Sequence, residues 1–566
     1  MTDKLNIAIA QINPTVGDID GNAQRILAAR MDAHKADLVV FSELVLCGYP
    51  PEDLVLKPAF QERIIDVVGE LARATSDGGP AMIIGTPWRV GGKLHNAALL
   101  LDGGEIAAVR LKWDLPNYGV FDEKRVFEAG PMPGPVNFRD VRIGIMICED
   151  MWKPDVTECL EESGAEFLLV LNGSPFDEKK HEQRLNLAVA RVTESGLPLA
   201  YVHQVGGQDE LVFDGASFVI NADCKPALQA PAFVEDIAMT TWSRTGDDWQ
   251  CEPQKLSPVS TGFEAMYSAM MLGLRDYVNK NGFPGIILGL SGGIDSALSA
   301  AVAVDALGAD RVHCVMMPSP YTSQDSLDDA AEVARLLGTK LDSISIEPAM
   351  NAFGDMLAPS FEDTQSGVAE ENIQSRTRGL ILMALSNKHG AMLLTTGNKS
   401  EMSVGYATLY GDMCGGYSVL KDVYKTDVFA LSEWRNAHVP AGALGPDGPA
   451  MPERVITKPP SAELKPDQTD QDTLPPYDIL DGILEALVEE EQSVESCIAS
   501  GYDEAVVRRN TNAARPRRGS RSPPGTSAAI AATPSPTALP VTFETQARPV
   551  YNHPHPEPVQ DLVRLA

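Results

Sequence analysis

Three side chains in the first half of the sequence have the chemistry to cleave an amide. Glu43 ends the run DLVVFSE, in which apolar residues lead directly to a carboxylate, and Cys148 ends the run VRIGIMIC. Lys112 lies in RLKWDLPNYGVF, next to a segment of turn-forming residues. A thiolate can attack a carbonyl, a carboxylate can shuttle protons, and an ammonium can lower the thiol pKa and hold the oxyanion. Together they predict amide hydrolysis through a thioester.

Each of these residues also has an ordinary explanation. A cysteine at the end of a strand is most often a small buried hydrophobe, a strand-end glutamate is usually solvated, and a lone lysine is usually a surface charge. The joint pattern favours a site, because ligands of open α/β folds collect at the carboxyl ends of strands. We therefore expect Glu43 and Cys148 to meet at one crevice.

A glycine-rich loop in the second half could bind phosphate. Residues 285–290 read as a strand, SGGIDS (291–296) as a loop, and the residues that follow as an alanine-rich helix. Backbone N–H groups of such a loop, with the positive end of the helix, bind phosphate without a side-chain charge. The loop has neither the Gly-Lys-Ser/Thr of a Walker A motif nor the G-x-G-x-x-G spacing. Taken alone it is equally compatible with a phosphate site and with a tight turn.

The elements that position these residues alternate between strand and helix, which is typical of layered α/β folds. In the first half we expect strands at 6–12, 37–41, 81–85, 97–101, 141–147, 167–171 and 199–202, and helices at 22–35 and 182–194. In the second half we expect helices at 263–279, 297–307 and 326–337 around strands at 285–290 and 312–317. The alternation of helices and strands in the second half predicts a doubly wound parallel sheet.

The chain of 566 residues is too long for one hydrophobic core, so two domains are expected. The polar stretch RTGDDWQCEPQKLSPVSTG shows no periodicity and reads as the connection between them. We predict a first domain at 1–245, a linker at 246–262, a second domain at 263–507 and a tail at 508–566.

Composition excludes several classes of function. The 46 basic and 78 acidic residues give a net charge of −32, which argues against sequence-independent binding to nucleic acid or anionic lipid. The eight cysteines are scattered without a C-x-x-C pair, which suits a reducing cytoplasm. We find no signal peptide pattern and no run of 18 apolar residues, so no association with a membrane is expected.

Four strings in the first half carry a family resemblance. FSELVLCGYPPEDL, LPNYGVFDEKRVF, ICEDMW and NGSPF, in this order, resemble the nitrilase-like glutaminase domain of glutamine-dependent NAD synthetases over about residues 4–240. The resemblance implies a nitrilase-like α-β-β-α sandwich with Glu43 as general base, Lys112 as cationic stabiliser and Cys148 as nucleophile. It also implies three residues that bind the substrate L-glutamine: Tyr118, Ser174 and Lys180. Outside these strings, the first two would read as ordinary polar loop residues.

The second half resembles the synthetase domain of the same family. SGGIDS after a strand is similar to the ATP loop of enzymes that adenylate a carboxylate, and MPSPYTSQDSLDDA, ENIQSRTRG and LLTTGNKSEMSVGYATLYGDMCGGYSVLKDVYKTDVF resemble NAD synthetases over about residues 263–435. The resemblance implies an adenine-nucleotide α-hydrolase-like domain. Its implied ATP-binding residues are Gly289, Leu290, Ser291, Gly292, Gly293, Ile294, Asp295, Ser296 and Thr396.

The same resemblance assigns the other substrates of the second domain. Asn372 and Glu401 would contact deamido-NAD, and Asp295 with Glu401 would hold Mg²⁺ beside the departing pyrophosphate. Lys425 would contact phosphate. Outside this motif, Glu401 and Lys425 would read as an exposed ion pair worth at most about 1 kcal/mol.

The tail departs from the family pattern. Members usually continue with a basic helix and a P-P-G turn that supply a lysine contact to the dinucleotide, but here the expected lysine is absent after Val507. The segment from about Arg508, rich in Arg and Pro, is expected to be poorly ordered. A shifted reading frame is our hypothesis for it.

The sequence thus predicts a glutamine-hydrolysing NAD synthetase. ATP would adenylate the nicotinate carboxylate of deamido-NAD, and ammonia from L-glutamine would displace AMP, in the final step of NAD biosynthesis. Because ammonia is mostly protonated at neutral pH, we expect a passage between the two sites, and by analogy with nitrilase-like domains we expect a homo-oligomer. Two alternatives stay open: an amidotransferase that adenylates a different acid, and a nucleotide-sensing protein with an inactive amidase site.

Overall fold

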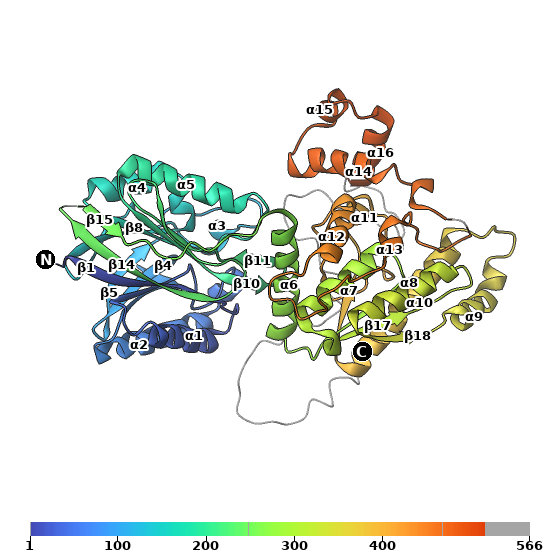
Figure 1. Cartoon of the computed structure of the whole chain (residues 1–566), viewed down its shortest axis with the longest axis horizontal. Helices are drawn as coiled ribbons and strands as arrows, with labels where there is room; N and C mark the ends of the chain where they lie inside the picture. The colour runs from blue at the N-terminus through green and yellow to red at the C-terminus, as the bar shows by residue number, and fades with distance from the viewer. Residues whose placement is uncertain (1, 247, 467, 515–566) are drawn as a thin grey trace.

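The computed structural model describes residues 2–246, 248–466 and 468–514. The chain forms two α/β units that meet along helix α6 (Gly262–Lys280) (Figure 1). Most of the predicted tail, residues 515–566, lies outside the described residues. The boundary predicted at Val507 falls inside helix α16 (Glu504–Ala514).

The first unit is an α-β-β-α sandwich. Within the described residues one sheet has the strand order β15-β14-β1-β2-β3-β4-β5, and the other has the order β13-β12-β9-β8-β7-β6. Because side chains alternate along a strand, one set fills the space between the sheets, including Ile7, Val40, Ile145 and Leu169. The strands are β1 (Lys4–Gln11), β2 (Leu38–Phe41), β3 (Ala81–Val90), β4 (Lys93–Asp102), β5 (Glu105–Leu111), β6 (Val136–Phe138), β7 (Val141–Ile147), β8 (Phe167–Asn172), β9 (Leu199–His203), β12 (Phe218–Ile220), β13 (Pro226–Gln229), β14 (Asp236–Thr245) and β15 (Asp248–Cys251). A separate hairpin consists of β10 (Val205–Gln208) and β11 (Leu211–Asp214).

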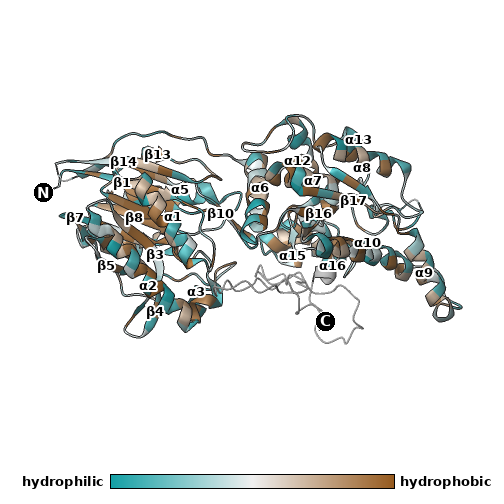
Figure 2. Ribbon diagram, turned by 90° about the horizontal axis from the view of Figure 1, so that it is seen from below, coloured by the Kyte–Doolittle hydropathy of each residue, from teal (hydrophilic) through white to brown (hydrophobic). Residues whose placement is uncertain are grey.

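Helices cover the outer face of each sheet, so apolar strands lie between amphipathic helices (Figure 2). Ile26 and Val67 pack with Phe41 on the first sheet, and Leu160 and Val192 pack on the second. The helices of this unit are α1 (Ile19–Asp32), α2 (Pro58–Ala74), α3 (Glu123–Val126), α4 (Pro154–Glu162) and α5 (Lys180–Ser195).

The second unit is built on a parallel sheet with the order β18-β17-β16-β19-β20. Leu288 packs with Leu298 of helix α7 on one face, whereas Ile287 packs with Leu385 of helix α10 on the other. Burial on both faces explains why the central strands β16 and β19 read as continuous apolar runs. The strands are β16 (Ile286–Gly289), β17 (Val312–Met316), β18 (Lys340–Ser343), β19 (Met392–Thr395) and β20 (Tyr417–Ser418). The helices after α6 are α7 (Ile294–Leu307), α8 (Gln324–Leu337), α9 (Glu347–Leu357), α10 (Val368–His389), α11 (Lys399–Val404), α12 (Lys425–Ala437), α13 (Glu453–Thr457), α14 (Tyr477–Leu484), α15 (Val494–Ala499) and α16.

The predicted linker at 246–262 is only partly irregular. Residues Asp248–Cys251 form strand β15, which pairs with the edge strand β14, and the side chains of Trp249 and Cys251 are buried. This strand was not predicted from the sequence, because the alternation of these four residues is too short to separate from a polar loop. From Glu252 to the start of α6 the chain makes no further named helix or strand.

The two units are joined by close polar contacts between α6 and the β10–β11 hairpin (Figure 1). Asp276 Oδ2 accepts hydrogen bonds from Asn13 Nδ2 at 2.6 Å and from the Gly207 backbone N–H at 2.7 Å. Lys280 Nζ donates to the Gly207 carbonyl at 2.8 Å. A side chain at Gly207 would lie only 2.8 Å from the Gly273 backbone, so the absence of a Cβ permits this approach. The contact fixes one unit against the other.

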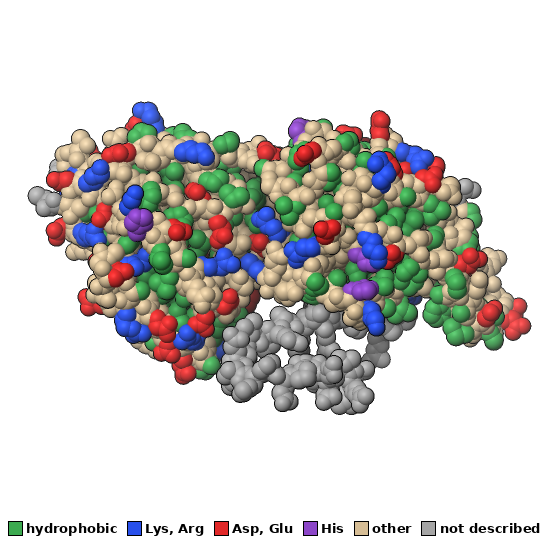
Figure 3. All heavy atoms as spheres, turned by 60° about the horizontal axis from the view of Figure 1, so that its bottom comes forward, with side chains coloured by type: hydrophobic (Ala, Val, Ile, Leu, Met, Phe, Trp, Pro, Cys, Tyr) green, Lys and Arg blue, Asp and Glu red, His purple; other side chains and the backbone are tan. Residues whose placement is uncertain are grey.

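The surface carries both signs of charge. On the face shown in Figure 3, acidic and basic side chains are interspersed over both units. Among the helices of the described residues, none combines the length and apolar character that a membrane crossing requires.

Two candidate active sites

Glu43, Lys112 and Cys148 come together inside the first unit. Each follows a strand: Glu43 comes after β2, Lys112 directly after β5 and Cys148 directly after β7. All three are buried, and Lys112 Nζ lies 2.7 Å from Glu43 Oε1. Cys148 has a φ of 46°, a left-handed conformation that is strained for a residue with a side chain. The predicted meeting of the three groups is therefore present in the structure.

Both acidic groups of this site have a raised pKa, so the resting thiol keeps its proton and Glu43 is a stronger base than an exposed glutamate. Burial raises the pKa of Cys148 well above its usual value, and the Glu43 charge adds to this effect while Lys112 opposes it. Burial also raises the pKa of Glu43 to about 7, against the opposing charge of Lys112. Within the described residues, Glu43 Oε2 has no hydrogen-bond partner. Glu43 can thus take up a proton near neutral pH.

A second carboxylate, Glu123, holds the lysine and was not predicted. Lys112 Nζ lies 2.8 and 2.9 Å from the two carboxylate oxygens of Glu123, and Tyr49 donates to Glu123 Oε1 at 3.0 Å. Burial opposes the charge of Lys112, but Glu123 and Glu43 outweigh it and raise the lysine pKa well above its usual value. The lysine therefore remains an ammonium. Asn96 donates to Glu43 Oε1 at 2.7 Å and orients that side chain.

The sequence signal for these supporting residues was weak. Glu123 lies in the string DEKR, whose charged neighbours are typical of an exposed turn. Asn96 was easier to find, because it is a polar residue that directly precedes the apolar run of residues 97–101 in strand β4. A polar side chain in a strand that is expected to be buried usually has a hydrogen-bond partner, so a contact of Asn96 with the site could have been predicted.

Two of the three predicted glutamine-binding residues, Tyr118 and Lys180, lie near the same thiol. The charge of Cys148 acts on the pKa of both Tyr118 and Lys180. Tyr118 donates to Glu149 Oε2 at 2.9 Å, and Lys180 Nζ lies 4.4 Å from the centre of the Trp152 ring. Ser174 is buried in the loop after β8. Their binding of glutamine stays a prediction.

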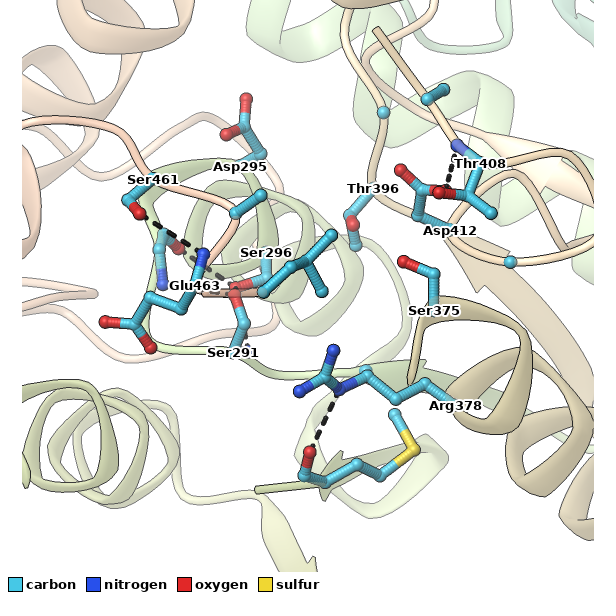
Figure 4. A pocket seen from close by; sticks show the side chains of 18 of the residues that line it. Ser291, Asp295, Ser296, Ser375, Arg378, Thr396, Thr408, Asp412, Ser461 and Glu463 are labelled. Carbon is cyan, nitrogen blue, oxygen red and sulfur yellow. Dashed lines mark hydrogen bonds between the residues drawn. The ribbon is translucent and has the colours of Figure 1, made fainter. Parts of the chain in front are cut away.

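The second site is a cavity of about 1090 Å³ at the carboxyl end of the parallel sheet. The glycine loop after β16 forms one wall, and Figure 4 shows Ser291 and Ser296 across the pocket from Ser375 and Arg378. Of the predicted residues, those lining the cavity are Gly289, Leu290, Ser291, Gly293, Ile294, Asp295, Ser296, Asn372, Thr396, Glu401 and Lys425. The cavity is large enough for a nucleotide and a second ligand.

Gly292 is the exception among the predicted loop residues, because it is not part of the cavity lining. Its φ is 83°, and a Cβ there would lie 2.3 Å from the Ser326 carbonyl oxygen. Gly292 therefore lets the loop pack against helix α8. The prediction that its own atoms line the ATP site is not supported by this geometry.

Asp295, Glu401 and Lys425 form a buried polar cluster at the cavity. Lys425 Nζ lies 2.5 Å from Asp295 Oδ2 and 3.1 Å from Glu401 Oε1, and Lys425 is 1% exposed. The alternative of an exposed ion pair is thus excluded. Asn398 donates to Asp295 Oδ1 at 2.7 Å and accepts from the Glu401 backbone N–H at 3.0 Å, so it links the Asp295 carboxylate to the backbone of Glu401.

These two carboxylates fit a magnesium ion that also binds substrate. Mg²⁺ is usually bound by one or two carboxylates, with phosphate oxygens and water completing the coordination. In the part of the chain that the structure describes, no group of three or more His, Cys, Asp or Glu is arranged to hold a metal alone. The donor set of Asp295 and Glu401 therefore suits an ion that arrives with a phosphate.

Asp481 of helix α14 supports this cluster and was not predicted. Its Oδ1 accepts from Ser400 Oγ at 2.5 Å, and its Oδ2 accepts from the Thr426 backbone N–H at 2.9 Å. Ser400 Oγ in turn accepts from the Lys425 backbone N–H at 2.8 Å. The contact fixes the starts of α11 and α12, which carry Glu401 and Lys425.

Comparison with known proteins finds one family match for each unit. Residues 6–246 match the carbon-nitrogen hydrolase family, and residues 266–524 match the NAD synthase family. The glutamine-dependent NAD(+) synthetase of Rhodobacter capsulatus is 51% identical over 90% of this chain and 92% of its own length, and that of Xanthomonas campestris is 48% identical over 88% and 90%. The structure of glutamine-dependent NAD+ synthetase from Acinetobacter baumannii in complex with ADP is 41% identical, with a TM-score of 0.76, over 93% of this chain and 97% of that one. The chain therefore belongs to the family of glutamine-dependent NAD(+) synthetases.

Proposed function

We propose that this chain converts deamido-NAD to NAD with ATP and with nitrogen from L-glutamine, releasing AMP, pyrophosphate and L-glutamate. The observation that carries the proposal is the pairing of two sites in one chain. A buried Cys148–Lys112–Glu43 group occupies one unit, and a nucleotide-sized cavity at the SGGIDS loop occupies the other.

Glutamine hydrolysis follows from the first site. Cys148 attacks the carboxamide carbon as its proton passes to Glu43, and Lys112 stabilises the oxyanion that forms. Collapse of this intermediate breaks the C–N bond, and Glu43 returns its proton to the leaving ammonia. Glu43 then takes a proton from the water that hydrolyses the thioester, which yields glutamate and restores the thiol.

Amide formation follows from the second site. The N–H groups of the loop before α7 bind the phosphates of ATP, and the carboxylate of deamido-NAD attacks the α-phosphorus to release pyrophosphate. Ammonia then displaces AMP from the acyl adenylate. Asp295 and Glu401 would hold Mg²⁺, which when bound neutralises negative charge on the departing pyrophosphate. Thr396 and Asn372 are proposed contacts to ATP and to deamido-NAD respectively.

The proposal also includes a passage for ammonia between the two sites and the association of the chain with a second copy of itself. The close contact of α6 with the β10–β11 hairpin supports the passage, because it holds the two units together. Large apolar side chains exposed on α9 and α10, namely Phe353, Met356 and Leu380, support the homo-oligomer.

The test of the proposed function is incubation of the purified protein with deamido-NAD, ATP, Mg²⁺ and glutamine. We expect NAD and AMP to form in equal amounts. Release of AMP with a different carboxylic acid, but not with deamido-NAD, would favour another amidotransferase. Absence of turnover with both glutamine and ammonia would favour a nucleotide sensor.

We expect the glutaminase activity to depend on pH through Glu43. Its pKa of about 7 means that the carboxylate, the form that accepts the thiol proton, is lost as the pH falls below 7. The kcat/KM for glutamate release should therefore decrease by about tenfold per pH unit well below this value. A profile that stays flat down to the ordinary pKa of a glutamate would contradict the assignment of Glu43 as the base.

Replacing Glu123 by glutamine should shift that profile. The negative charge of Glu123 contributes to the raised pKa of Glu43, so its removal should move the acid limb to lower pH. Lys112 also loses an ionic anchor, and we expect kcat to fall by roughly tenfold or more. Glu128→Gln is the matched control, because Glu128 is exposed and pairs with Lys93. An unchanged profile and kcat in Glu123→Gln would show that the second carboxylate has no part in the reaction.

A further inference from the structure

Arg184 is a buried arginine of helix α5 whose hydrogen bonds hold the loop that follows β8. Its Nη2 donates to the Ser174 carbonyl at 2.8 Å, to the Pro175 carbonyl at 3.0 Å and to Ser174 Oγ at 3.4 Å. The arginine is 1% exposed, so these contacts are shielded from water. One guanidinium group thus fixes both the backbone and the hydroxyl of Ser174.

The same loop packs directly against the general base. A Cβ added to Gly173 would lie 3.1 Å from Glu43 Oε2 and 3.1 Å from the Tyr49 ring. Glu43 Oε2 is the carboxylate oxygen without a hydrogen-bond partner among the described residues. A displacement of the loop would therefore alter both the Ser174 hydroxyl and the space around the oxygen that receives the proton.

Asp214 fixes the arginine from the opposite side. Arg184 Nη1 donates to Asp214 Oδ1 at 2.7 Å, and His203 Nε2 lies 3.5 Å from the same oxygen. Burial alone would raise the pKa of Asp214, but Arg184 and His203 outweigh it and hold the pKa below its usual range. The aspartate is thus ionised and pairs with a buried cation that would otherwise lack a counter-charge.

Asp214 also connects this loop to the hairpin that contacts the second unit. It is the last residue of β11, and the Phe176 backbone N–H donates to the carbonyl of Val212 in the same strand at 2.6 Å. A Cβ at Gly273 of α6 would lie 3.0 Å from Val212 Cγ2. The loop of Ser174 is therefore anchored to the strand that packs on α6.

We propose that Arg184 and Asp214 are positioning residues for glutamine hydrolysis, in which Arg184 sets Ser174 and the adjacent loop against Glu43 and Asp214 sets Arg184. The proposal rests on the proposed function of this site. Neither residue reacts with the substrate. They act by keeping the loop in the one geometry that binds the glutamine and leaves Glu43 Oε2 open to the thiol.

The experiment compares glutamine-dependent and ammonia-dependent NAD formation in Arg184→Gln, Arg184→Lys and Asp214→Asn. We expect Arg184→Gln to raise the KM for glutamine by about tenfold or more, since small misplacements of a binding group have effects of this size. Ammonia-dependent NAD formation uses the second site and should be unchanged. Arg184→Lys keeps the charge beside Asp214 and should restore part of the glutamine affinity, and Asp214→Asn should change KM in the same direction as Arg184→Gln.

Arg191→Gln is the matched control. Arg191 is also buried on α5, but its ion pair, at 2.8 Å, is with Glu194 of its own helix. A general loss of stability in α5 would affect both arginine variants alike. We expect Arg191→Gln to keep the wild-type KM for glutamine.

Two results would overturn the proposal. The first is a wild-type KM for glutamine in Arg184→Gln. The second is an equal loss of glutamine-dependent and ammonia-dependent activity in all three variants, which would show a structural role only. Should Arg184→Gln fail to fold, the KM values of Arg184→Lys and Asp214→Asn decide between the same outcomes. Failure of the wild-type protein to release glutamate from glutamine would instead refute the proposed function of the site.

Discussion

Replacing Cys148 by alanine should abolish NAD formation from glutamine and leave NAD formation from ammonia intact. The alanine removes the thiol that follows β7 and would form the thioester, so we expect glutamate release to fall by at least ~10³-fold. The cavity of the second unit shares no residue with this site. Added ammonium salts should therefore support NAD formation in the variant as they do in the wild-type protein.

The measurement for this variant is the rate of NAD formation with each nitrogen donor, together with glutamate release. Cys159→Ala is the matched control, because Cys159 lies on α4 and its Sγ donates to the Pro133 carbonyl at 3.4 Å. Full retention of glutamine-dependent activity in Cys148→Ala would exclude this thiol as the nucleophile. Loss of the ammonia-dependent activity as well would show that the two sites do not work separately.

Replacing Asp295 by asparagine should impair the second site and spare the first, which is the reverse of the result expected for Cys148→Ala. Asp295 is a charged partner of Lys425 and a proposed ligand of Mg²⁺, and asparagine keeps its shape but removes its charge. We expect NAD formation from both glutamine and ammonia to fall by at least ~10²-fold, because the charge on the departing pyrophosphate loses its stabilisation. Glutamate release, which depends on the first unit, should continue.

Asp310→Asn serves as its control, since Asp310 is exposed beyond the far end of α7, the helix whose first turn contains Asp295. NAD and AMP are measured with both nitrogen donors, and glutamate is measured in parallel. NAD formation at the wild-type rate in Asp295→Asn would remove this carboxylate from the mechanism. A complete loss of folded protein would be visible as loss of glutamate release.

Two of the groups that react could be predicted from the sequence because each comes at the end of an apolar run. Glu43 and Cys148 stand out as polar or reactive residues directly beyond buried runs, and strand ends of α/β folds meet at one edge. Asp295 needed the family resemblance, because the glycine loop separates it from the strand that ends at Gly289. Lys112 needed the family resemblance, because a lysine before a turn has no distinguishing feature.

The groups that support them could not be predicted, because their partners are distant in the sequence. Asp481 and Ser400 are 81 residues apart, and Arg184 and Asp214 are 30 residues apart. A buried ion pair of this kind depends on how helices and strands pack, which local periodicity does not report. Glu123 shows the same limit, since its charged neighbours conceal a side chain that is buried against Lys112.

The strands also divide into those that the sequence predicts and those that it does not. The central strands β1, β2, β7 and β8 are apolar runs buried between layers, and their predicted ranges agree closely with the structure. Strand β15 exists because it pairs with β14, and the hairpin β10–β11 is positioned by its contact with α6. Such short elements depend on tertiary contacts more than on their own propensity.

The central claim is that nitrogen freed at Cys148 is joined to a carboxylate activated in the cavity of the second unit. The most direct test supplies glutamine labelled with nitrogen-15 in its side-chain amide, together with deamido-NAD, ATP and Mg²⁺, and analyses the NAD by mass spectrometry. The account predicts NAD that carries the label, with one AMP released for each NAD. NAD without the label, or AMP released without NAD, would contradict it.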